Sequence, residues 1–128
     1  MKDIIETITN LTDSNLLQLY SVYIQELRDR KIIRTKNIME DLGVYFAITH
    51  YNKTDRLPNL IPAPDGTQNI DALSRNGERY SIKVTTTNTT GSFAGLYDKD
   101  STEADSQKFE FAVVVVLDDN LKLKNIFE

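Results

Sequence analysis

The sequence predicts a one-domain α/β protein in which N-terminal helices pack on a mixed β-sheet of about four strands. Three observations support this fold class. Apolar residues recur at helical spacing in the first 51 positions, residues 68–83 have the pattern of a β-hairpin, and residues 109–117 contain the run Ala-Val-Val-Val-Val. Helices that precede a hairpin and a buried strand are expected to cover the sheet that those strands form.

Two helices are expected at the start of the chain. A short first helix should end at Asn10, and Thr12 or Ser14 can cap the second. On the outside of the second helix, Glu26 and Arg30 have the i,i+4 spacing of an ion pair. Its apolar stripe is expected to be core rather than a partner groove. The stripe consists of Leu16, Leu17, Tyr20, Tyr23, Ile24 and Leu27.

A third helix and a long loop are expected before the hairpin. Thr35 can cap a helix over residues 36–51. One face of that helix carries Ile38, Leu42, Tyr45, Phe46 and Thr49. Over residues 52–67 the periodicity stops, and three prolines exclude both a helix and a central strand. Such a long connection is usually a functional or mobile loop, and Lys53 and Arg56 give this one phosphate-binding capacity.

The hairpin of residues 68–83 has two candidate registers. A two-residue type I′ turn at Asn76-Gly77 would mix polar and apolar side chains on both faces. A three-residue loop with Gly77 in the left-handed conformation keeps the apolar side chains on one face, so the period-2 rule selects it. This register pairs Ser74 with Glu78, Ala72 with Tyr80, Asp71 with Ser81 and Ile70 with Ile82.

The selected register gathers three polar groups on the other face of the hairpin. Asp71 and Ser81 become cross-strand neighbours, and Lys83 lies diagonally beside them. An aspartate that binds Mg²⁺ and a lysine that orients water or neutralises developing charge are what metal-dependent phosphodiester hydrolysis needs. Mg²⁺ usually takes only one or two protein carboxylates. The patch of Asp71, Ser81 and Lys83 is therefore the candidate active site.

Two further strands are expected after the hairpin. Thr85, Thr86 and Thr87 have the β propensity to extend its second strand, and their hydroxyls can bond phosphates or base edges. The apolar β-branched run within residues 109–117 is typical of a central strand that is buried on both faces. Apolar residues between 121 and 126 indicate one more strand at the edge of the sheet.

Composition limits the functions that are expected. The chain has no cysteine, which excludes disulfides, thiolate zinc sites and a cysteine nucleophile. No apolar run approaches the ~18 residues of a membrane span, and the N-terminus resembles an amphipathic helix rather than a leader, so we expect a cytoplasmic protein. The net charge of −4 argues against holding nucleic acid by bulk electrostatics. Contacts with nucleic acid would then be local or helped by a metal ion.

Asp71 and the later Ser81-Ile82-Lys83 resemble the core of the PD-(D/E)XK, or restriction-endonuclease-like, nuclease family. The segment 40–47 resembles the glutamate-bearing helix that opens that fold. The similarity covers residues 35–117 and matches the order of helix, hairpin and buried strand. It implies a Mg²⁺-dependent deoxyribonuclease, with Mn²⁺ as a substitute ion and DNA as the partner.

The resemblance also implies roles for named residues. The implied catalytic residues are Asp71, Ser81, Lys83 and Glu40. The implied metal ligands are Asp71, Glu40 and Asp41. We expect DNA contacts from Lys53, Arg56, Arg75, Thr85, Thr86 and Thr87.

Two positions depart from the pattern of the family. Ser81 stands where the second acid is expected, and Val44 stands where related sequences often carry the helix glutamate, so Glu40 or Asp41 would have to replace it. We expect residues 1–34 to be a helical part of the domain and residues 35–128 to be the nuclease-like core. This core is shorter than usual, which leaves open a minimal version, a fragment or half of a homodimer.

Two alternative functions stay open. One is a catalytically degenerate relative that keeps the fold as a DNA-binding or protein-interaction module. The other is an unrelated small α/β domain in which Asp71 and Lys83 form only a structural ion pair.

Overall fold

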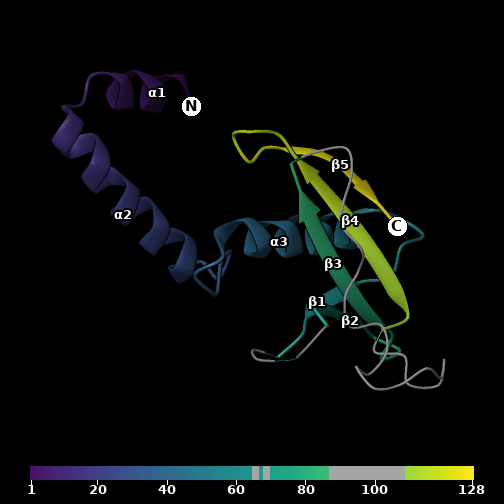
Figure 1. Cartoon of the computed structure of the whole chain (residues 1–128). Helices are drawn as coiled ribbons and strands as arrows, with labels where there is room; N and C mark the ends of the chain where they lie inside the picture. The colour runs from purple at the N-terminus through teal and green to yellow at the C-terminus, as the bar shows by residue number, and fades with distance from the viewer. Residues whose placement is uncertain (65–66, 68–69, 87–108) are drawn as a thin grey trace. The chain divides into compact units, whose positions relative to one another are not determined.

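A computed structural model describes residues 1–64, 67, 70–86 and 109–128 (Figure 1). The chain divides into two compact units, Met1–Arg34 and Thr35–Glu128. Within the described residues, no helix is both long and apolar enough to span a membrane.

The N-terminal unit consists of α1 (Lys2–Thr9) and α2 (Asp13–Asp29). Asn10 is the C-cap of α1, as predicted. Thr12 is the N-cap of α2, because its hydroxyl accepts a 3.2 Å hydrogen bond from the backbone N–H of Asn15. The predicted pair of Arg30 and Glu26 is also confirmed, with 2.8 Å between Nε and Oε2.

The prediction that the apolar stripe of α2 is core is wrong. Neither α1 nor α2 has a buried residue. Leu17, Tyr20 and Tyr23 are 75%, 61% and 58% exposed. Helical periodicity shows that a helix has an apolar face, but it does not show which part of the protein covers that face.

The second unit contains a mixed sheet of five strands in the order β1-β2-β3-β4-β5. The strands are β1 (Leu60–Pro62), β2 (Ala72–Ser74), β3 (Arg79–Thr85), β4 (Phe111–Leu117) and β5 (Leu123–Phe127). β3 and β4 are parallel, and the other neighbours are antiparallel. The α/β class is thus confirmed, with one strand more than expected. The extra strand, β1, lies at the edge of the sheet, where Pro62 is tolerated because its missing N–H faces no neighbouring strand.

Next to the turn, the hairpin has the predicted register, whereas the predicted pairs of Asp71 with Ser81 and of Ile70 with Ile82 lie outside the ladder of β2 and β3. Ala72 pairs with Tyr80, and the N–H of Ser74 donates a 3.0 Å hydrogen bond to the carbonyl of Glu78. Gly77 has a φ of +80° and donates its N–H to the carbonyl of Ser74 at 3.0 Å. These contacts define the three-residue loop, and the positive φ explains why glycine occupies position 77.

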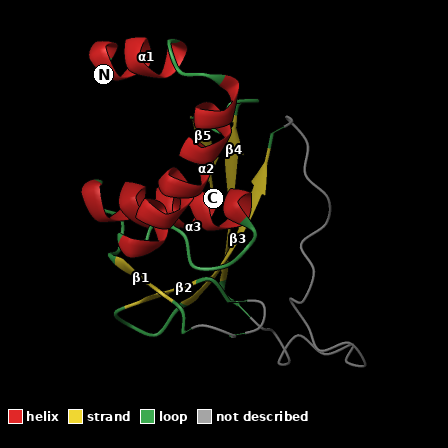
Figure 2. Ribbon diagram, turned by 90° about the vertical axis from the view of Figure 1, so that its left-hand side faces the viewer, coloured by secondary structure: helices red, strands yellow, loops and turns green. Residues whose placement is uncertain are grey.

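Helix α3 (Ile38–Lys53) covers one face of this sheet (Figure 2). Its buried residues are Gly43, Ala47 and Tyr51. None of these belongs to the predicted face of Ile38, Leu42, Tyr45, Phe46 and Thr49, of which Phe46 is partly buried against the core. The small side chains of Gly43 and Ala47 let the helix backbone approach the strands. A Cβ added to Gly43 would lie 1.9 Å from Cγ2 of Val84 in β3.

The N-terminus of α3 also differs from the prediction. Asn37, not Thr35, is the N-cap, and its side-chain oxygen accepts a 3.3 Å hydrogen bond from the N–H of Glu40. Thr35 instead donates its N–H and its hydroxyl to Oδ2 of Asp41, at 2.6 and 2.9 Å. The segment before the helix is thereby tied to its first turn.

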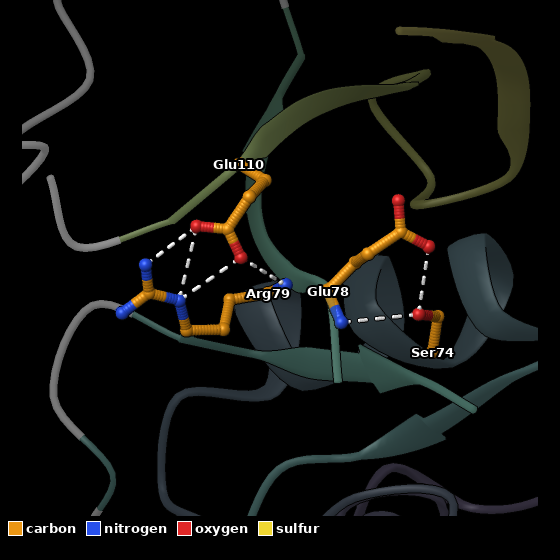
Figure 3. Close-up of polar contacts among 4 residues, drawn as sticks. All are labelled: Ser74, Glu78, Arg79 and Glu110. Atoms are coloured by element: carbon orange, nitrogen blue, oxygen red, sulfur yellow. Dashed lines mark hydrogen bonds and ion pairs between the residues drawn. The ribbon is translucent and has the colours of Figure 1, made fainter. Parts of the chain in front are cut away.

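Strand β4 is the central strand that the valine run predicted. Val113, Val115 and Leu117 are buried, and β4 pairs with β3 on one side and β5 on the other. At its start, Glu110 accepts hydrogen bonds from both the backbone N–H and the guanidinium of Arg79 in β3, two of them at 2.9 and 3.0 Å (Figure 3). This Arg79–Glu110 clamp fixes where the parallel pairing of β3 and β4 begins.

Candidate functional site

Asp71 lies immediately before β2 and is held by its backbone from two sides. Its N–H donates a 2.8 Å hydrogen bond to the carbonyl of Tyr80 in β3. Its carbonyl accepts a 2.9 Å hydrogen bond from the N–H of Ala63, which follows β1. These two hydrogen bonds fix the backbone of Asp71 between β1 and β3, and with it the position from which the half-buried side chain extends.

The carboxylate of Asp71 reaches the backbone of β3. Its Oδ2 accepts a 2.7 Å hydrogen bond from the N–H of Ile82. In a continued antiparallel ladder this N–H would bond to a carbonyl of the neighbouring strand, so the carboxylate replaces that carbonyl where β2 begins. Asp71 thus has a structural role. An ionised carboxylate offers about four acceptor sites, and carboxylate oxygens are ligands that Mg²⁺ binds in proteins.

Ser81 and Lys83 occupy alternate positions of β3, on either side of Ile82. Because the neighbours Tyr80 and Ile82 belong to the core under α3, the side chains of Ser81 and Lys83 project from the opposite face of the sheet. Ser81 is 9% exposed and pairs with Ala112 of β4, whereas Lys83 is exposed to solvent. The structure therefore brings Asp71 beside this segment of β3 through its hydrogen bonds with Tyr80 and Ile82, rather than through the predicted pair with Ser81.

No ion pair joins Lys83 to a carboxylate in the part of the chain that the structure describes. The ion pair that one alternative assumed between Asp71 and Lys83 is therefore not found there, while the unrelated small α/β domain of that alternative stays a prediction.

Glu40 and Asp41 lie in the first turn of α3, which covers the face of the sheet opposite Ser81 and Lys83. Glu40 is exposed, and the carboxylate of Asp41 holds Thr35. Within the described ranges, no three His, Asp or Glu side chains gather as a metal-binding group. The structure thus brings Asp71, Ser81 and Lys83 to one segment, but it does not gather Glu40 and Asp41 with Asp71.

The predicted DNA-binding residues lie at two ends of the sheet. Tyr51 near the end of α3 stacks edge-on with Tyr80 near the start of β3, with 5.5 Å between ring centroids. Lys53, the last residue of α3, and Arg56, which follows the helix, therefore lie toward the end of the sheet where β3 begins. Arg75 occupies the loop before β3.

The predicted threonines lie at the other end of the sheet. Thr85 ends β3 and Thr86 follows it, so the length of the strand, roughly 20 Å, separates them from Arg75. Thr87 lies outside the described residues. The predicted residues therefore do not form a single continuous surface.

The structure also forms a cavity of about 600 Å³ that the sequence did not indicate. Arg56, the stacked rings of Tyr80 and Phe111, and the carboxylates of Glu78 and Glu128 contribute to its wall. Both carboxylates accept hydrogen bonds from neutral hydroxyls: Glu78 from Ser74 at 2.9 Å (Figure 3), and Glu128 from Tyr51. These residues come from segments far apart in the chain, so no local motif could reveal the cavity.

Burial and the nearby carboxylates influence the two tyrosines beside this cavity. Burial is the main cause that raises the pKa of Tyr51, and the hydrogen bond to Glu128 raises it further. The pKa of Tyr80 is raised mainly by burial and also by the charges of Glu128 and Glu78. Both phenols therefore stay protonated at neutral pH.

The chain matches no protein-family model, and no curated protein sequence matches it.

Proposed function

We propose that this protein is a metal-dependent deoxyribonuclease of the PD-(D/E)XK type, which hydrolyses phosphodiester bonds at the segment of β3 beside Asp71. One observation carries the proposal: the carboxylate of Asp71 reaches β3 between Ser81 and Lys83, where it accepts the N–H of Ile82 at 2.7 Å. A carboxylate that reaches β3 and an accessible ammonium on that strand supply a metal ligand and a charge stabiliser for phosphoryl transfer.

The order of elements supports the same proposal. Helix α3 is followed by a hairpin of β2 and β3, and then by the buried strand β4. This is the order on which the resemblance to the nuclease family was based. β4 runs parallel to β3, so the sheet has the mixed character that the order of elements predicted.

The residues beside β3 fit a magnesium site with one carboxylate. Asp71 would hold the ion, and the hydroxyl of Ser81 would be a neutral ligand, while water and substrate phosphate would fill the other positions. Bound Mg²⁺ polarises the phosphate as a Lewis acid. Lys83, which is exposed and in no described ion pair, orients the attacking water or stabilises the charge that develops on the phosphate.

A second candidate function is a catalytically degenerate relative that binds DNA or protein. The small number of acidic side chains around the site favours this second function. Ser81 replaces the second acid, and Asp41 accepts two hydrogen bonds from Thr35. A site with one carboxylate binds a divalent ion more weakly than a site with two, because ligand charge increases affinity for hard cations.

The experiment that separates these functions uses two substitutions of Asp71. Asp71→Asn keeps an oxygen that can accept a hydrogen bond from the N–H of Ile82, so this N–H keeps its partner. The negative charge that attracts the metal ion is lost. Asp71→Ala removes both the charge and the acceptor. Nicking of supercoiled DNA is measured with Mg²⁺, with Mn²⁺ and with chelator, and thermal unfolding is followed for each variant.

The nuclease proposal predicts metal-dependent nicking by the wild type, little or none by Asp71→Asn, and near-wild-type stability of Asp71→Asn. Lys83→Ala should lower nicking by at least about tenfold without unfolding the protein, because Lys83 is exposed. Lys83→Arg keeps the charge and should retain more activity than Lys83→Ala. Nicking that persists in both Asp71→Asn and Lys83→Ala would refute the proposal. Binding of DNA without metal, unchanged in Asp71→Asn, would favour the degenerate relative.

A further inference from the structure

Helix α2 has an exposed apolar face. None of its residues is buried, and Leu16, Leu17, Tyr20 and Tyr23 are between 43% and 75% exposed. Exposed apolar patches of this extent on one helix are uncommon in monomers and mark sites of association. The face is therefore a candidate interface.

The spacing of this face fits a second helix of the same kind. Leu16, Tyr20, Tyr23 and Leu27 follow one another at intervals of four, three and four residues, which is the spacing of a coiled-coil seam. These intervals are the same in both chain directions, and a leucine stands at each end with the two tyrosines between. A two-fold axis midway along α2 would place Tyr20 opposite Tyr23 of a second copy, and Leu16 opposite Leu27 of that copy.

The charges at the two ends of α2 fit the same arrangement. Asp13 begins the helix, and Arg30 is its C-cap. The same two-fold axis would place Asp13 of each copy opposite Arg30 of the other, beside Glu26, which already bonds to Arg30. Antiparallel packing also sets the positive end of each helix dipole beside the negative end of its neighbour. A parallel pair would instead bring like charges together.

The area is sufficient for a small specific interface. Tyrosine side chains present roughly 150–250 Å² each, so the exposed parts of Leu16, Leu17, Tyr20 and Tyr23 with their neighbours offer on the order of 600 Å² per chain. Two copies would bury about 1,200 Å² in total, at the lower end of stable protein interfaces.

We propose that this protein forms a homodimer through an antiparallel pair of α2 helices, with Tyr20 and Tyr23 of the two copies at the centre. A two-fold interface uses the same surface on both chains, which the reversible seam of α2 satisfies. The aromatic rings stack across the axis, and the leucines close the interface on either side. The dimer is expected to form whether or not the protein is a nuclease.

Sedimentation equilibrium of the full chain tests the proposal. The wild type should be dimeric at micromolar concentration. Tyr20→Glu places two buried glutamates, one from each copy, at the centre of the interface. It should therefore raise the Kd for dimerisation at least about tenfold. Gln18→Glu adds the same charge on the opposite side of α2 and should leave the Kd unchanged. Glutamate favours helix formation, and circular dichroism of each variant checks that the helices persist.

Cysteine cross-linking tests the orientation, and the chain has no cysteine of its own to interfere. Leu16→Cys and Leu27→Cys should form a disulfide when the two variants are mixed, and neither should cross-link efficiently with itself. A disulfide between two copies of Leu16→Cys would indicate parallel helices and overturn the proposal. A wild type that stays monomeric would overturn it as well, whether another part of the chain or a different protein covers the face. So would a Kd that Tyr20→Glu leaves unchanged.

Discussion

Replacing Gly43 with alanine tests how closely α3 packs on the sheet. The added Cβ would lie 1.9 Å from Cγ2 of Val84, 3.0 Å from its Cβ and 3.2 Å from its Cγ1. Carbon atoms pack best at about 3.5–4.0 Å. Rotation of the valine side chain cannot relieve the contact between the two Cβ atoms, so the helix or the strand must move.

The expected cost follows from two opposing effects. Overpacking a core costs about 1–3 kcal/mol, whereas alanine is favoured over glycine within a helix by about 1 kcal/mol. The 1.9 Å approach puts the overpacking near the upper end of that range, so we expect Gly43→Ala to lower the free energy of unfolding by about 2 kcal/mol. Urea unfolding and calorimetry measure this change, and each kcal/mol should lower Tm by about 4–8 °C in a domain of this size.

A double-mutant cycle isolates the contact. Val84→Ala alone should destabilise the protein because it removes packed methyl groups. Combined with Gly43→Ala, it should cost less than the two single changes added together, because the methyl group that clashes is gone. Additive costs would show that the two residues are not coupled. A Gly43→Ala variant as stable as the wild type would refute the close packing of α3 on β3.

Three further predictions concern the clamp, the buried tyrosine and the candidate site. The hydrogen bonds from Arg79 lower the pKa of Glu110 from its ordinary 4.5, so the clamp stabilises the protein above that pH, and its contribution should be lost on acidification below it. Glu110→Gln should cost about 0.5–1 kcal/mol at pH 7, because the pair is partly exposed, and should show a smaller loss in acid-unfolding curves. Tyr51→Phe removes the hydrogen bond to Glu128 and should cost about 1 kcal/mol at pH 7. Because the pKa of Tyr51 is raised above its ordinary 10.0, the wild type loses stability as the pH rises beyond 10, and denaturant titrations should show that this variant loses less. Ser81→Asp supplies the missing carboxylate and should lower the Mg²⁺ concentration needed for DNA nicking; an unchanged metal requirement would contradict the assignment of this position.

The sequence predicted the parts of the fold that local chemistry determines. The glycine at position 77 and the alternation around it specified the hairpin register, which the pairing of Ala72 with Tyr80 confirms. The valine run predicted β4, and the threonine at position 12 predicted the start of α2. In each case the residues that determine the structure are neighbours in the chain, so a single segment contains the information.

The parts that sequence reasoning missed depend on distant partners. The buried face of α3 is formed by Gly43 and Ala47, which a search for large apolar residues passes over. The hydrogen bond from Ile82 to the carboxylate of Asp71 was not foreseen either, because it depends on where β2 begins. The sequence therefore predicted that Asp71 lies beside β3, but not the contact that orients its carboxylate.

The two edges of the sheet differ in their capacity to accept another strand. At β1, the ring of Pro62 removes a donor that a foreign strand would need, and the strand is only three residues long. At β5, a longer strand exposes Leu123 and Phe127, with Lys124 between them. Sheet-to-sheet aggregation, or capture of an extended peptide, would therefore proceed from the β5 edge. Lys124 opposes such pairing, because a charge on an edge strand repels the same charge on an identical chain.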